Sequence, residues 1–461
     1  MRLRKDQIRL APTDLSNYLN CAHLTQLDLR AARGLCERPA PYSPVIEELK
    51  AKGLAHESAY AEHLKAQGLD VLDLDESYDV ERTLEAMRDG VDVIYQAPLI
   101  DPVWSGRADF LVRVAMPSAL GDWSYEAQDT KLARDTRAGT LLQLGVYSVL
   151  LGRLQEFLPR YMHVVTPGRD WQPLRYRIDD YNAYFRLLEH GIDAFLKAPP
   201  PTYPELVPHC DLCVWWQTCE TQRRGDDHLC YVAGISAGQI AALRELGIAT
   251  LTELATAPDI EKPGHGSRDA LLRLRDQARV QLEGRRAEAP QHEIKQPIDG
   301  EHGFMLLPEP SPDDIYLDFE GSHYVEDGVQ EYLTGYVVRK GSNRFDYTPL
   351  WADSLSREQQ AFERFIDFAI ATRRRNPNAH IYHFGAYEPA AIKRQMGRFA
   401  TREIEVDELL RGNAFVDLHT VVRRALIASV EGYSIKNLEP HFGFEREQDL
   451  REASRSRRII E

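Results

Sequence analysis

The stretch WSYEAQDTKLA, residues 123–133, is predicted to be a strand that ends in an acid and a lysine. Just before it lies GRADFLVRVA, residues 106–115, whose β-branched and aromatic residues also predict a strand. Apolar residues recur at helical spacing in residues 140–154, after the two strands, and in residues 13–34, before them. This order predicts an α/β fold for the first half of the chain.

Two acids and one lysine of these strands have the residue types of a metal-dependent hydrolytic site. Residues two apart on a strand point to the same face, so Asp129 and Lys131 project together, and a neighbouring strand can bring Asp109 alongside. Two carboxylates hold a hard divalent cation such as Mg²⁺, which polarises a phosphodiester and lowers the pKa of a bound water. A lysine beside the ion can orient that water or offset developing negative charge. For each residue taken singly, the alternative is an ordinary structural position.

Three further side chains are candidates for the same site. His56, in KGLAHESAY, lies on a predicted helix and could add an imidazole ligand. Gln143 and Tyr147 are four residues apart on one face of the helix predicted at 140–154. They could hold Lys131 or contact a nucleic acid strand.

In this order along the chain, the candidates resemble the RecB branch of the PD-(D/E)XK nucleases. The matching motifs are Gly53-x-x-His56, Gly106-x-x-Asp109, Asp129-x-Lys131 and Gln143-x3-Tyr147. The resemblance covers about the first half of the chain and implies a restriction-endonuclease-like fold. In that family the histidine and the two acids bind the metal ion, the lysine is catalytic, and the Gln/Tyr helix supports the substrate and the lysine.

Three cysteines in HCDLCVWWQTC, residues 209–219, have C-x2-C-x5-C spacing, and a metal site usually needs four ligands. Some RecB-like nucleases, including AddB and the CRISPR adaptation exonucleases, carry an iron–sulfur cluster whose first cysteine precedes the nuclease core. This resemblance implies a 4Fe–4S cluster that staples the two ends of the domain together. Zn²⁺ bound by four cysteines is one alternative, and unligated thiols are another. The implied ligands are Cys21, Cys210, Cys213 and Cys219, with Cys36 and Cys230 left as free thiols.

The middle of the chain is predicted to be helical and resembles a helix-hairpin-helix element. Gly-Ile turns at Gly234 and Gly247 each precede a predicted helix. In such elements, backbone N–H groups at the hairpin and at the following helix N-terminus bind a nucleic acid phosphate. A packed spacer between two catalytic domains is the alternative.

A second set of acids follows proline-rich boundaries. IYLDFEG, residues 315–321, places Asp318 and Glu320 on the same strand face, as in the bridging carboxylates of a two-metal nuclease. Later elements offer Glu388, after a strand and turn, and Asp417, at a strand-to-helix transition.

This order resembles the DnaQ-type exonucleases of the RNase H-like fold, and the YprB-like branch in particular, from about Asp314 to the end. Glu388 stands where the family has aspartate. Ser456 lies near the place of the family's final acid, for which Asp449 is a substitute. The alternative to a second catalytic site is a degenerate nucleic-acid-binding domain.

The chain as a whole is acidic, with 56 Lys+Arg against 71 Asp+Glu, which argues against a basic coat for nucleic acid. It contains no P-loop motif, no secretory signal and no apolar run long enough to span a membrane, so we expect a cytoplasmic protein. The expected domains are 1–225 (RecB-like nuclease with a four-cysteine cluster), 226–295 (helical adaptor) and 296–461 (RNase H-like).

These observations predict a nuclease that uses Mg²⁺ or Mn²⁺, with DNA as the favoured substrate, in repair, recombination or defence. If the family precedent holds, hydrolysis leaves a 5′-phosphate and a 3′-hydroxyl. The alternative is a catalytically degenerate scaffold that binds nucleic acid for a helicase partner. Related proteins often carry a helicase after these domains, so either a helicase acts in trans or the natural protein is longer than this chain.

Overall fold

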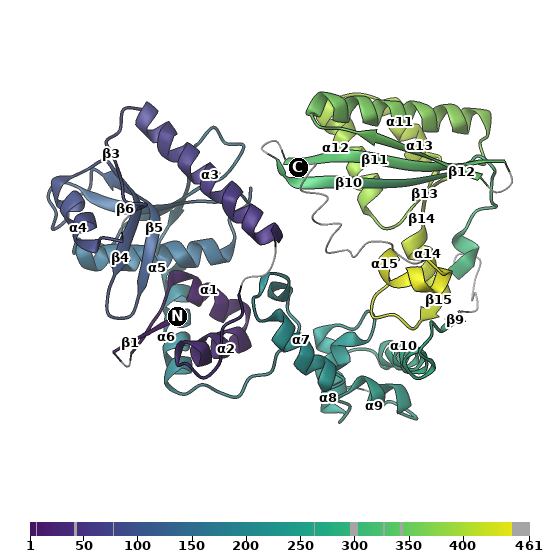
Figure 1. Ribbon diagram of the computed structural model, residues 1–461, viewed down its shortest axis with the longest axis horizontal. Coiled ribbons are helices and arrows are strands. Elements are labelled where there is room, and N and C mark those ends of the chain that lie inside the picture. The colour runs from purple at the N-terminus through teal and green to yellow at the C-terminus, as the bar shows by residue number, and fades with distance from the viewer. Residues whose placement is uncertain are drawn as a thin grey trace. The chain divides into compact units, whose positions relative to one another are not determined.

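The computed structural model describes residues 1–5, 7–40, 44–76, 78–261, 263–295, 303–325, 328–341 and 344–444. The chain forms two compact units, Met1–Gln222 and Arg223–Glu461 (Figure 1). Both units combine helices with β-sheet, so the chain has the mixed α/β composition that the sequence predicts. None of the described helices is long and apolar enough to cross a membrane.

The first unit begins with a two-stranded hairpin, β1 (Arg2–Arg4) and β2 (Gln7–Arg9). Two helices follow where the sequence predicted one, α1 (Pro12–Asn20) and α2 (Ala22–Ala32). They are separated by Cys21, whose backbone is extended, with φ −161° and ψ 110°. The Cys21 sulfur accepts a hydrogen bond from the Leu24 amide and so caps α2. The break therefore places the Cys21 thiol at a helix junction.

A six-stranded sheet in the order β3-β4-β5-β6-β7-β8 forms the core of the first unit. Strands β4, β5 and β6 are an antiparallel run, and β6 pairs in parallel with β7, which follows a helical crossover. The strands are β3 (Val71–Asp73), β4 (Val93–Ile100), β5 (Ser105–Val114), β6 (Ser124–Thr130), β7 (Tyr161–Val165) and β8 (Leu174–Arg177). The helices around them are α3 (Pro44–Ala66), α4 (Val80–Asp89), α5 (Ala138–Leu154) and α6 (Asp179–Lys197).

Strand β6 is buried along its whole length. Helices α3 and α5 both contact it (Figure 1), so it is shielded on both faces. A strand covered on both faces needs apolar or internally paired residues. The acids of β6, Glu126 and Asp129, are therefore exceptions, and each needs a hydrogen-bonding or charged partner.

The second unit begins with a small helical part that has its own apolar core, including Leu229, Leu243, Leu251 and Leu271. Helix α7 (Trp216–Gly225) runs across the division between the units. The helical elements that follow are η2 (Leu229–Tyr231), α8 (Ala237–Glu245), α9 (Leu251–Thr256) and α10 (Arg268–Ala287).

The remainder of the second unit contains a five-stranded sheet in the order β12-β11-β10-β13-β14. The first three strands are antiparallel, whereas β13 and β14 lie parallel to β10. The strands are β10 (Ile315–Val325), β11 (Gly328–Lys340), β12 (Arg344–Trp351), β13 (Ile381–His383) and β14 (Phe415–Asp417), and a separate pair joins β9 (His292–Ile294) to β15 (Leu426–Ala428). The helical elements are η3 (Gly303–Leu306), α11 (Leu355–Arg375), α12 (Tyr387–Phe399), α13 (Glu403–Arg411), α14 (Leu418–Ala425), α15 (Ile435–Leu438) and η4 (Glu439–Phe442).

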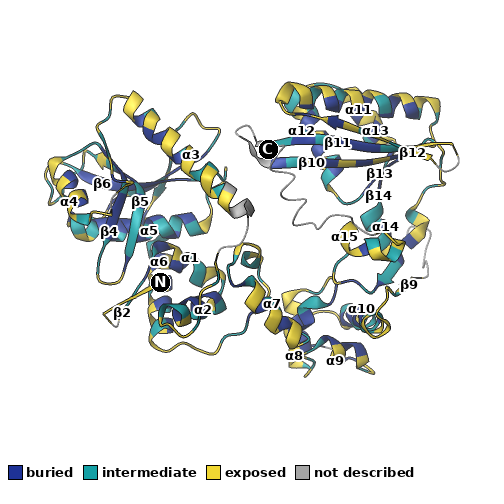
Figure 2. Ribbon diagram, in the orientation of Figure 1, coloured by how far each residue is buried: buried dark blue, intermediate teal, exposed yellow. Residues whose placement is uncertain are grey.

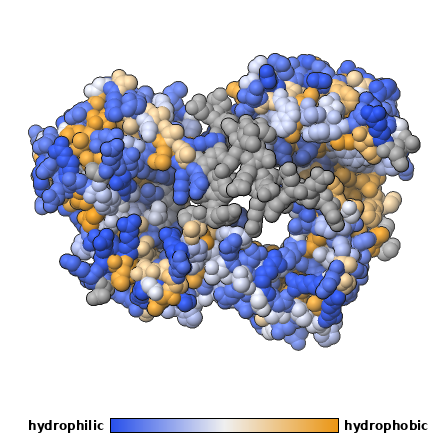
Figure 3. All heavy atoms as spheres, in the orientation of Figure 1, coloured by the Kyte–Doolittle hydropathy of each residue, from blue (hydrophilic) through white to orange (hydrophobic). Residues whose placement is uncertain are grey.

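Buried residues concentrate in the two sheets and on the helix faces turned toward them (Figure 2). On the visible outer surface of each unit, hydrophilic and hydrophobic residues are interspersed (Figure 3). Helix α11 illustrates the pattern, because Phe362, Phe365 and Ile366 are buried while its last turn carries three exposed or half-buried arginines.

Candidate functional site

Asp129 lies at the carboxyl end of β6, and its side chain is 1% exposed. The Lys131 Nζ atom lies 2.5 Å from Asp129 Oδ2. Burial, together with the charge of nearby Asp109, raises the pKa of Asp129 well above its usual range, although Lys131 opposes the shift. Burial alone would lower the pKa of Lys131, but the charges of Asp129 and Asp109 outweigh it, so the ammonium stays charged at neutral pH.

Asp109 joins this pair from the middle of β5. Its Oδ2 atom accepts a hydrogen bond of 3.1 Å from the backbone amide of Thr130, the residue between Asp129 and Lys131. The structure therefore brings together the two aspartates and the lysine that the sequence singled out. Their proximity depends on the antiparallel pairing of β5 with β6.

Glu57 is a third acid at this site, and the sequence analysis missed it. It lies on α3, is 7% exposed, and has a pKa raised to about 7, first by burial and then by the charge of Asp109. Gln96 donates a hydrogen bond to its Oε1 atom. A signal was present in the sequence, since Glu57 lies three and four residues before the buried Tyr60 and Ala61 and so falls on the apolar stripe of the helix.

His56, the predicted imidazole ligand, is the neighbour of Glu57 on α3. Its ring stacks on Trp171, with ring centroids 5.1 Å apart and an interplanar angle of 24°. Metal binding by His56 stays a prediction. On this turn of α3, Glu57 interacts electrostatically with Asp109 and Lys131.

Gln96 has an unusual backbone conformation in the interior of β4, with φ 54°. The pairs Tyr95↔Phe110 and Ala97↔Ala108 on either side place Gln96 opposite Asp109. A left-handed conformation of a residue other than glycine stores strain of about 1–3 kcal/mol, and such strain is concentrated at functional sites. This backbone conformation directs the side-chain amide of Gln96 toward Glu57, to which it donates a hydrogen bond.

Tyr147 connects helix α5 to β5. Its hydroxyl donates a hydrogen bond of 2.6 Å to the Arg107 carbonyl, and Gln143 is also hydrogen-bonded to the Tyr147 side chain. Burial and the charges of Asp109 and Asp129 raise the pKa of Tyr147, so the phenol remains protonated. Gly106 permits this approach, because a Cβ atom there would lie 2.9 Å from the Tyr147 ring. The Gln/Tyr pair thus positions the strand that carries Asp109.

The raised pKa of Glu57 leads to a stability prediction for the protein in EDTA. Between the ordinary value of 4.5 and about 7, the folded state binds more protons than the unfolded state, so this carboxyl reduces stability as pH rises. The full effect is on the order of 3 kcal/mol. We expect Glu57→Gln to raise the Tm of the first unit at pH ~8 but to change it little at pH ~5. A thermal unfolding series across this range measures the difference, with Glu62→Gln, an exposed position on the same helix, as control. Equal shifts at both pH values would contradict the assignment.

The four predicted cluster cysteines line one small cavity in the first unit, together with Trp215 and Trp216. Cys21 comes from the α1–α2 junction, Cys210 and Cys213 from the turn η1 (Pro208–Leu212) and its end, and Cys219 from α7. Burial, and then the nearby thiols of Cys21 and Cys210, raise the pKa of Cys213. All six cysteines are free of disulfides.

Trp215 anchors this region. It is 3% exposed, and its Nε1 atom donates a hydrogen bond of 2.9 Å to Asp28 on α2. Cys36 packs against the same apolar cluster, whereas Cys230 packs in the helical part of the second unit. In the part of the chain that the structure describes, no three His, Cys, Asp or Glu side chains are grouped so that they could hold a metal ion as they stand.

In the second unit, Asp318 and Glu320 project from the face of β10 opposite the buried Leu317 and Phe319. Each of the two residues is exposed when taken as a whole, although the Asp318 carboxyl group is partly buried. Partial burial of the Asp318 carboxyl, followed by the charges of Glu320 and Glu388, raises the pKa of Asp318 to about 6. Asp318 therefore interacts electrostatically with Glu320 and Glu388, two of the other three predicted acids.

Glu388 lies in the first turn of α12 and is 4% exposed. Its Oε2 atom lies 3.5 Å from Nδ1 of the buried His383, at the end of β13, and accepts no hydrogen bond from the described residues. His383 was missed by the sequence analysis. Its position directly before the turn that leads to Glu388 was the available signal.

Asp417, the fourth predicted acid, has partners for both of its oxygens. Oδ1 accepts hydrogen bonds from the amides of Gly385 and His419, and Oδ2 accepts one of 2.6 Å from the Thr420 hydroxyl. These bonds cap α14 and hold the loop after β13 in place, and they lower the pKa of Asp417. A ligand role for Asp417 stays a prediction. The candidate terminal acid Asp449 and the nearby Ser456 lie outside the described residues.

A buried ion network supports the start of α12. Glu331 on β11 is 1% exposed, pairs with Arg394, and accepts a hydrogen bond of 2.8 Å from the Tyr387 hydroxyl. Tyr387 directly precedes Glu388, so the network sets the position of that acid. Gly321 on β10 leaves the necessary space, since a Cβ atom there would overlap with Glu331 Oε2.

Residues 315–459 match the RNase_H superfamily. The C-terminal domain is RNase H-like. The matched segment starts with β10 and includes Asp318, Glu320, Glu388 and Asp417, so the RNase H-like domain contains the whole second set of predicted acids. No curated protein matches this chain.

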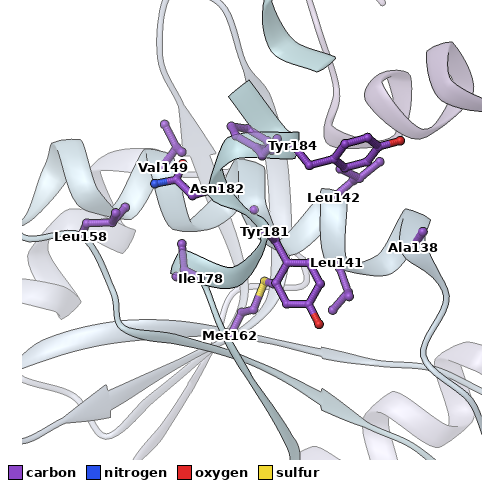
Figure 4. A pocket seen from close by; sticks show the side chains of 12 residues that line it. Ala138, Leu141, Leu142, Val149, Leu158, Met162, Ile178, Tyr181, Asn182 and Tyr184 are labelled. Atoms are coloured by element: carbon purple, nitrogen blue, oxygen red, sulfur yellow. The ribbon is translucent and has the colours of Figure 1, made fainter. Parts of the chain in front are cut away.

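The first unit also contains a cavity of about 290 Å³, and none of the predicted site residues lines it. Figure 4 shows this cavity. It is lined mainly by apolar side chains of α5 and α6, with Met162 of β7 at its floor. Asn182 and two tyrosines supply its polar atoms, and no acid, histidine or cysteine is among its lining residues.

Proposed function

We propose that the chain is a metal-dependent nuclease whose principal site is formed by Asp109, Asp129 and Lys131, with Glu57 as an additional acid. The observation that carries the proposal is the burial of Asp129, 1% exposed, beside a second carboxylate. Two neighbouring carboxylates in a buried position are unfavourable unless a cation balances them. Such an arrangement is typical of a site that binds a divalent ion.

The donor chemistry of this site suits Mg²⁺ or Mn²⁺, because hard divalent cations prefer carboxylate oxygens. Asp109, Asp129 and Glu57 would have to draw closer together around the ion than they stand in the structure. Asp109, Asp129 and Glu57 would hold the ion, with His56 as a further candidate. When bound, the ion supplies Lewis acid chemistry toward a phosphodiester and makes a water molecule more acidic. Lys131 contributes to balancing the charge of Asp129 through their ion pair.

Lys131 would act on the nucleic acid directly. Its ammonium remains charged, and its side chain is 32% exposed, so solvent can reach it. In that position it can hold an attacking water by a hydrogen bond or offset the negative charge that develops on the scissile phosphate. Gln96 keeps Glu57 oriented, and Tyr147 keeps β5 in place through the Arg107 carbonyl.

The arrangement of the sheet also supports this proposal. Asp109 and Asp129 lie on adjacent antiparallel strands, after helix α3 and before helix α5, and the parallel strand β7 follows. This succession agrees with the resemblance to the RecB-like PD-(D/E)XK nucleases. With that resemblance, the products would carry a 5′-phosphate and a 3′-hydroxyl.

The RNase H-like domain offers a second hydrolytic site. Domains of this kind are typically metal-dependent nucleases and usually use Mg²⁺ or Mn²⁺. Asp318, Glu320 and Glu388 would be its ligands, and the raised pKa of Asp318 reflects partial burial first and then repulsion by the other two acids. A nuclease assay of the Asp318→Ala variant distinguishes hydrolysis by this domain from nucleic acid binding alone.

The experiment is a nuclease assay on end-labelled single- and double-stranded DNA and RNA, with Mg²⁺ and with EDTA. Activity that requires the metal and is lost in Lys131→Ala but kept in Asp318→Ala assigns hydrolysis to the first site. The reverse pattern assigns it to the RNase H-like domain. Activity that persists in each single variant but is lost in the Lys131→Ala/Asp318→Ala double variant assigns hydrolysis to both sites. Activity that persists in the double variant contradicts both site assignments, and an inactive wild-type chain favours a scaffold for nucleic acid or a helicase partner.

We further propose that Cys21, Cys210, Cys213 and Cys219 bind a 4Fe–4S cluster with a structural role. The four thiols line one cavity, and a cluster is wider than a single ion, so its sulfur ligands lie farther apart than those of Zn²⁺. The cluster would join α2 to the end of the first unit.

For Cys21→Ser we expect at least a severalfold loss of bound iron after anaerobic purification, together with a lower Tm of the first unit, because the staple is lost. Iron analysis and visible absorption measure the first effect, and thermal unfolding measures the second. Cys230→Ser is the matched control, since this thiol lies outside the cavity. Stoichiometric zinc in the wild-type protein, or a colourless protein without metal, would contradict the cluster.

The biological setting follows from the same resemblances. We propose DNA as the principal substrate, in repair, recombination or defence, with a helicase as partner. Helices α8 and α9 would contribute nucleic acid contacts through the turns at Gly234 and Gly247, both of which have positive φ.

A further inference from the structure

A pocket lined by arginines lies beside the first site. The hairpin of β1 and β2, together with the start of β5, encloses a cavity of about 390 Å³. Tyr78 forms part of its wall and hydrogen-bonds to Ser105 and the Gly106 carbonyl at the beginning of β5. The four arginines that line it are Arg2, Arg4, Arg9 and Arg107.

Three of these arginines project from the same face of the hairpin. Arg2 and Arg9 are direct cross-strand partners, and Arg4 is two residues from Arg2 on the same strand. Like charges placed directly opposite each other destabilise a strand pair. The opposed charges of Arg2 and Arg9 therefore destabilise the hairpin, and an anion bound between these two side chains would relieve the repulsion.

The structure gives these three side chains little compensation. Among the residues that it describes, no ion pair engages Arg2, Arg4 or Arg9. The Arg9 Nε atom is buried and has no hydrogen-bond partner there. By contrast, Arg107 contacts Asp75 with its Nη1 atom, 2.9 Å from the carbonyl and 3.3 Å from the carboxylate. A buried donor without an acceptor is itself evidence for a missing ligand.

The pocket is connected to the proposed catalytic residues through β5. Arg107 is two residues before Asp109 on β5, about 7 Å along the strand. Tyr147 lies between the two regions, since its hydroxyl bonds to the Arg107 carbonyl while its pKa responds to Asp109, Asp129 and Tyr78. This separation is similar to the distance between successive phosphates of an extended nucleic acid strand.

We propose that the arginine pocket binds a phosphate group of the nucleic acid strand that is cut at the first site. The inference rests on the proposed nuclease function and adds a substrate-positioning site to it. Guanidinium groups bind phosphate oxygens through paired, charge-assisted hydrogen bonds. A bound phosphate would pair with Arg9 and relieve the repulsion between Arg2 and Arg9, while Arg107 orients the same strand toward Asp109. The phosphate is either an internal phosphodiester or the terminal phosphate of the strand.

The experiment measures binding separately from cleavage. Full-length protein carrying Lys131→Ala is titrated in EDTA with 3′-fluorescein single-stranded DNA, with either a 5′-hydroxyl or a 5′-phosphate, over a range of salt concentrations. The test variant adds Arg2→Gln and Arg9→Gln, and the control adds Arg186→Gln, an exposed arginine on α6. We expect the test variant to bind about tenfold more weakly, with a salt slope smaller by about 0.7 for each phosphate that the protein no longer neutralises.

The two DNAs distinguish the source of the phosphate. An equal loss of affinity for both indicates an internal phosphodiester, whereas a loss confined to the 5′-phosphorylated DNA indicates the terminal phosphate. Unchanged affinity and salt slope in the test variant overturn the inference. Removal of opposed charges should leave the Tm of the metal-free protein unchanged or higher, whereas a purely structural role for the arginines predicts a lower Tm.

Failure of the inference is distinguishable from failure of the proposed function. A wild-type chain that cuts DNA while the arginine variant binds normally refutes the pocket alone. A chain that binds DNA through these arginines but cuts nothing refutes the nuclease proposal and leaves the pocket as a nucleic acid site.

Discussion

Lys131→Met is expected to slow metal-dependent cleavage by about 10²–10³-fold, provided that hydrolysis occurs at the first site. Methionine keeps most of the apolar length of lysine but has no charge and no N–H donor. The variant therefore loses the group that holds the water or offsets charge on the phosphate, while the carboxylates remain. Single-turnover cleavage of end-labelled DNA at saturating enzyme measures the chemical step apart from substrate binding.

The same substitution should also alter the metal-free protein. Without the ammonium 2.5 Å away, the buried Asp129 carboxylate lacks its nearest cation, and its pKa rises further. The Tm measured in EDTA should therefore fall more at high pH than at low pH. Lys197→Met, an exposed lysine on α6, is the control and should cleave at the wild-type rate. Wild-type cleavage by Lys131→Met would remove this residue from the mechanism.

Glu331→Ala is expected to destabilise the second unit by about 1.5–3 kcal/mol. Glu331 is 1% exposed, and its removal leaves Arg394 without its partner and the Tyr387 hydroxyl without an acceptor. Because Tyr387 precedes Glu388, the substitution should also displace that acid from Asp318. Hydrogen exchange measured by mass spectrometry, for peptides of β11 and α12, gives the local free energy of opening.

Gly321→Ala tests the same network from the opposite side. Its Cβ atom would lie 2.5 Å from the Tyr387 hydroxyl and would also overlap with Glu331 Oε2, so the network must shift although no charge is removed. Asp353→Ala breaks an exposed pair with Arg357 in the same unit and should cost less than about 1 kcal/mol. Similar exchange rates in Glu331→Ala and Asp353→Ala would show that the network does not hold α12.

Several parts of the two sites could be predicted from the sequence because they depend on local periodicity. Asp129 and Lys131 point the same way because the side-chain period of a strand is two residues, and the same rule joins Asp318 to Glu320. The four-residue spacing of Gln143 and Tyr147 likewise follows from the helix. The prediction that one helix covers residues 13–34 was wrong, because Cys21 adopts an extended backbone that ends α1 and caps α2.

Other parts depend on contacts between distant segments, which local periodicity does not reveal. Glu57 reaches Asp109 only because α3 packs across β6, and Gln96 reaches Glu57 through a left-handed residue inside β4. Asp417 resembled a ligand in the sequence, but its oxygens are engaged by the loop after β13 and by its own helix.

By itself, the sequence determined the mixed α/β character of the chain, the RNase H-like C-terminal domain and the acids and lysine that share strand faces. The α/β character and the shared strand faces follow from hydrophobic periodicity and from spacing within single elements, which short segments already specify. The RNase H-like domain was instead expected from the resemblance of its ordered acids to a known family, and the superfamily match at residues 315–459 supports it. The tertiary structure alone decided that Glu57 lies near Asp109, that Glu331 supports Glu388, and that three arginines of the hairpin line one cavity. Burial changes the energy of a charge according to what lies next to it, and those neighbours come from strand register and helix packing across long stretches of chain.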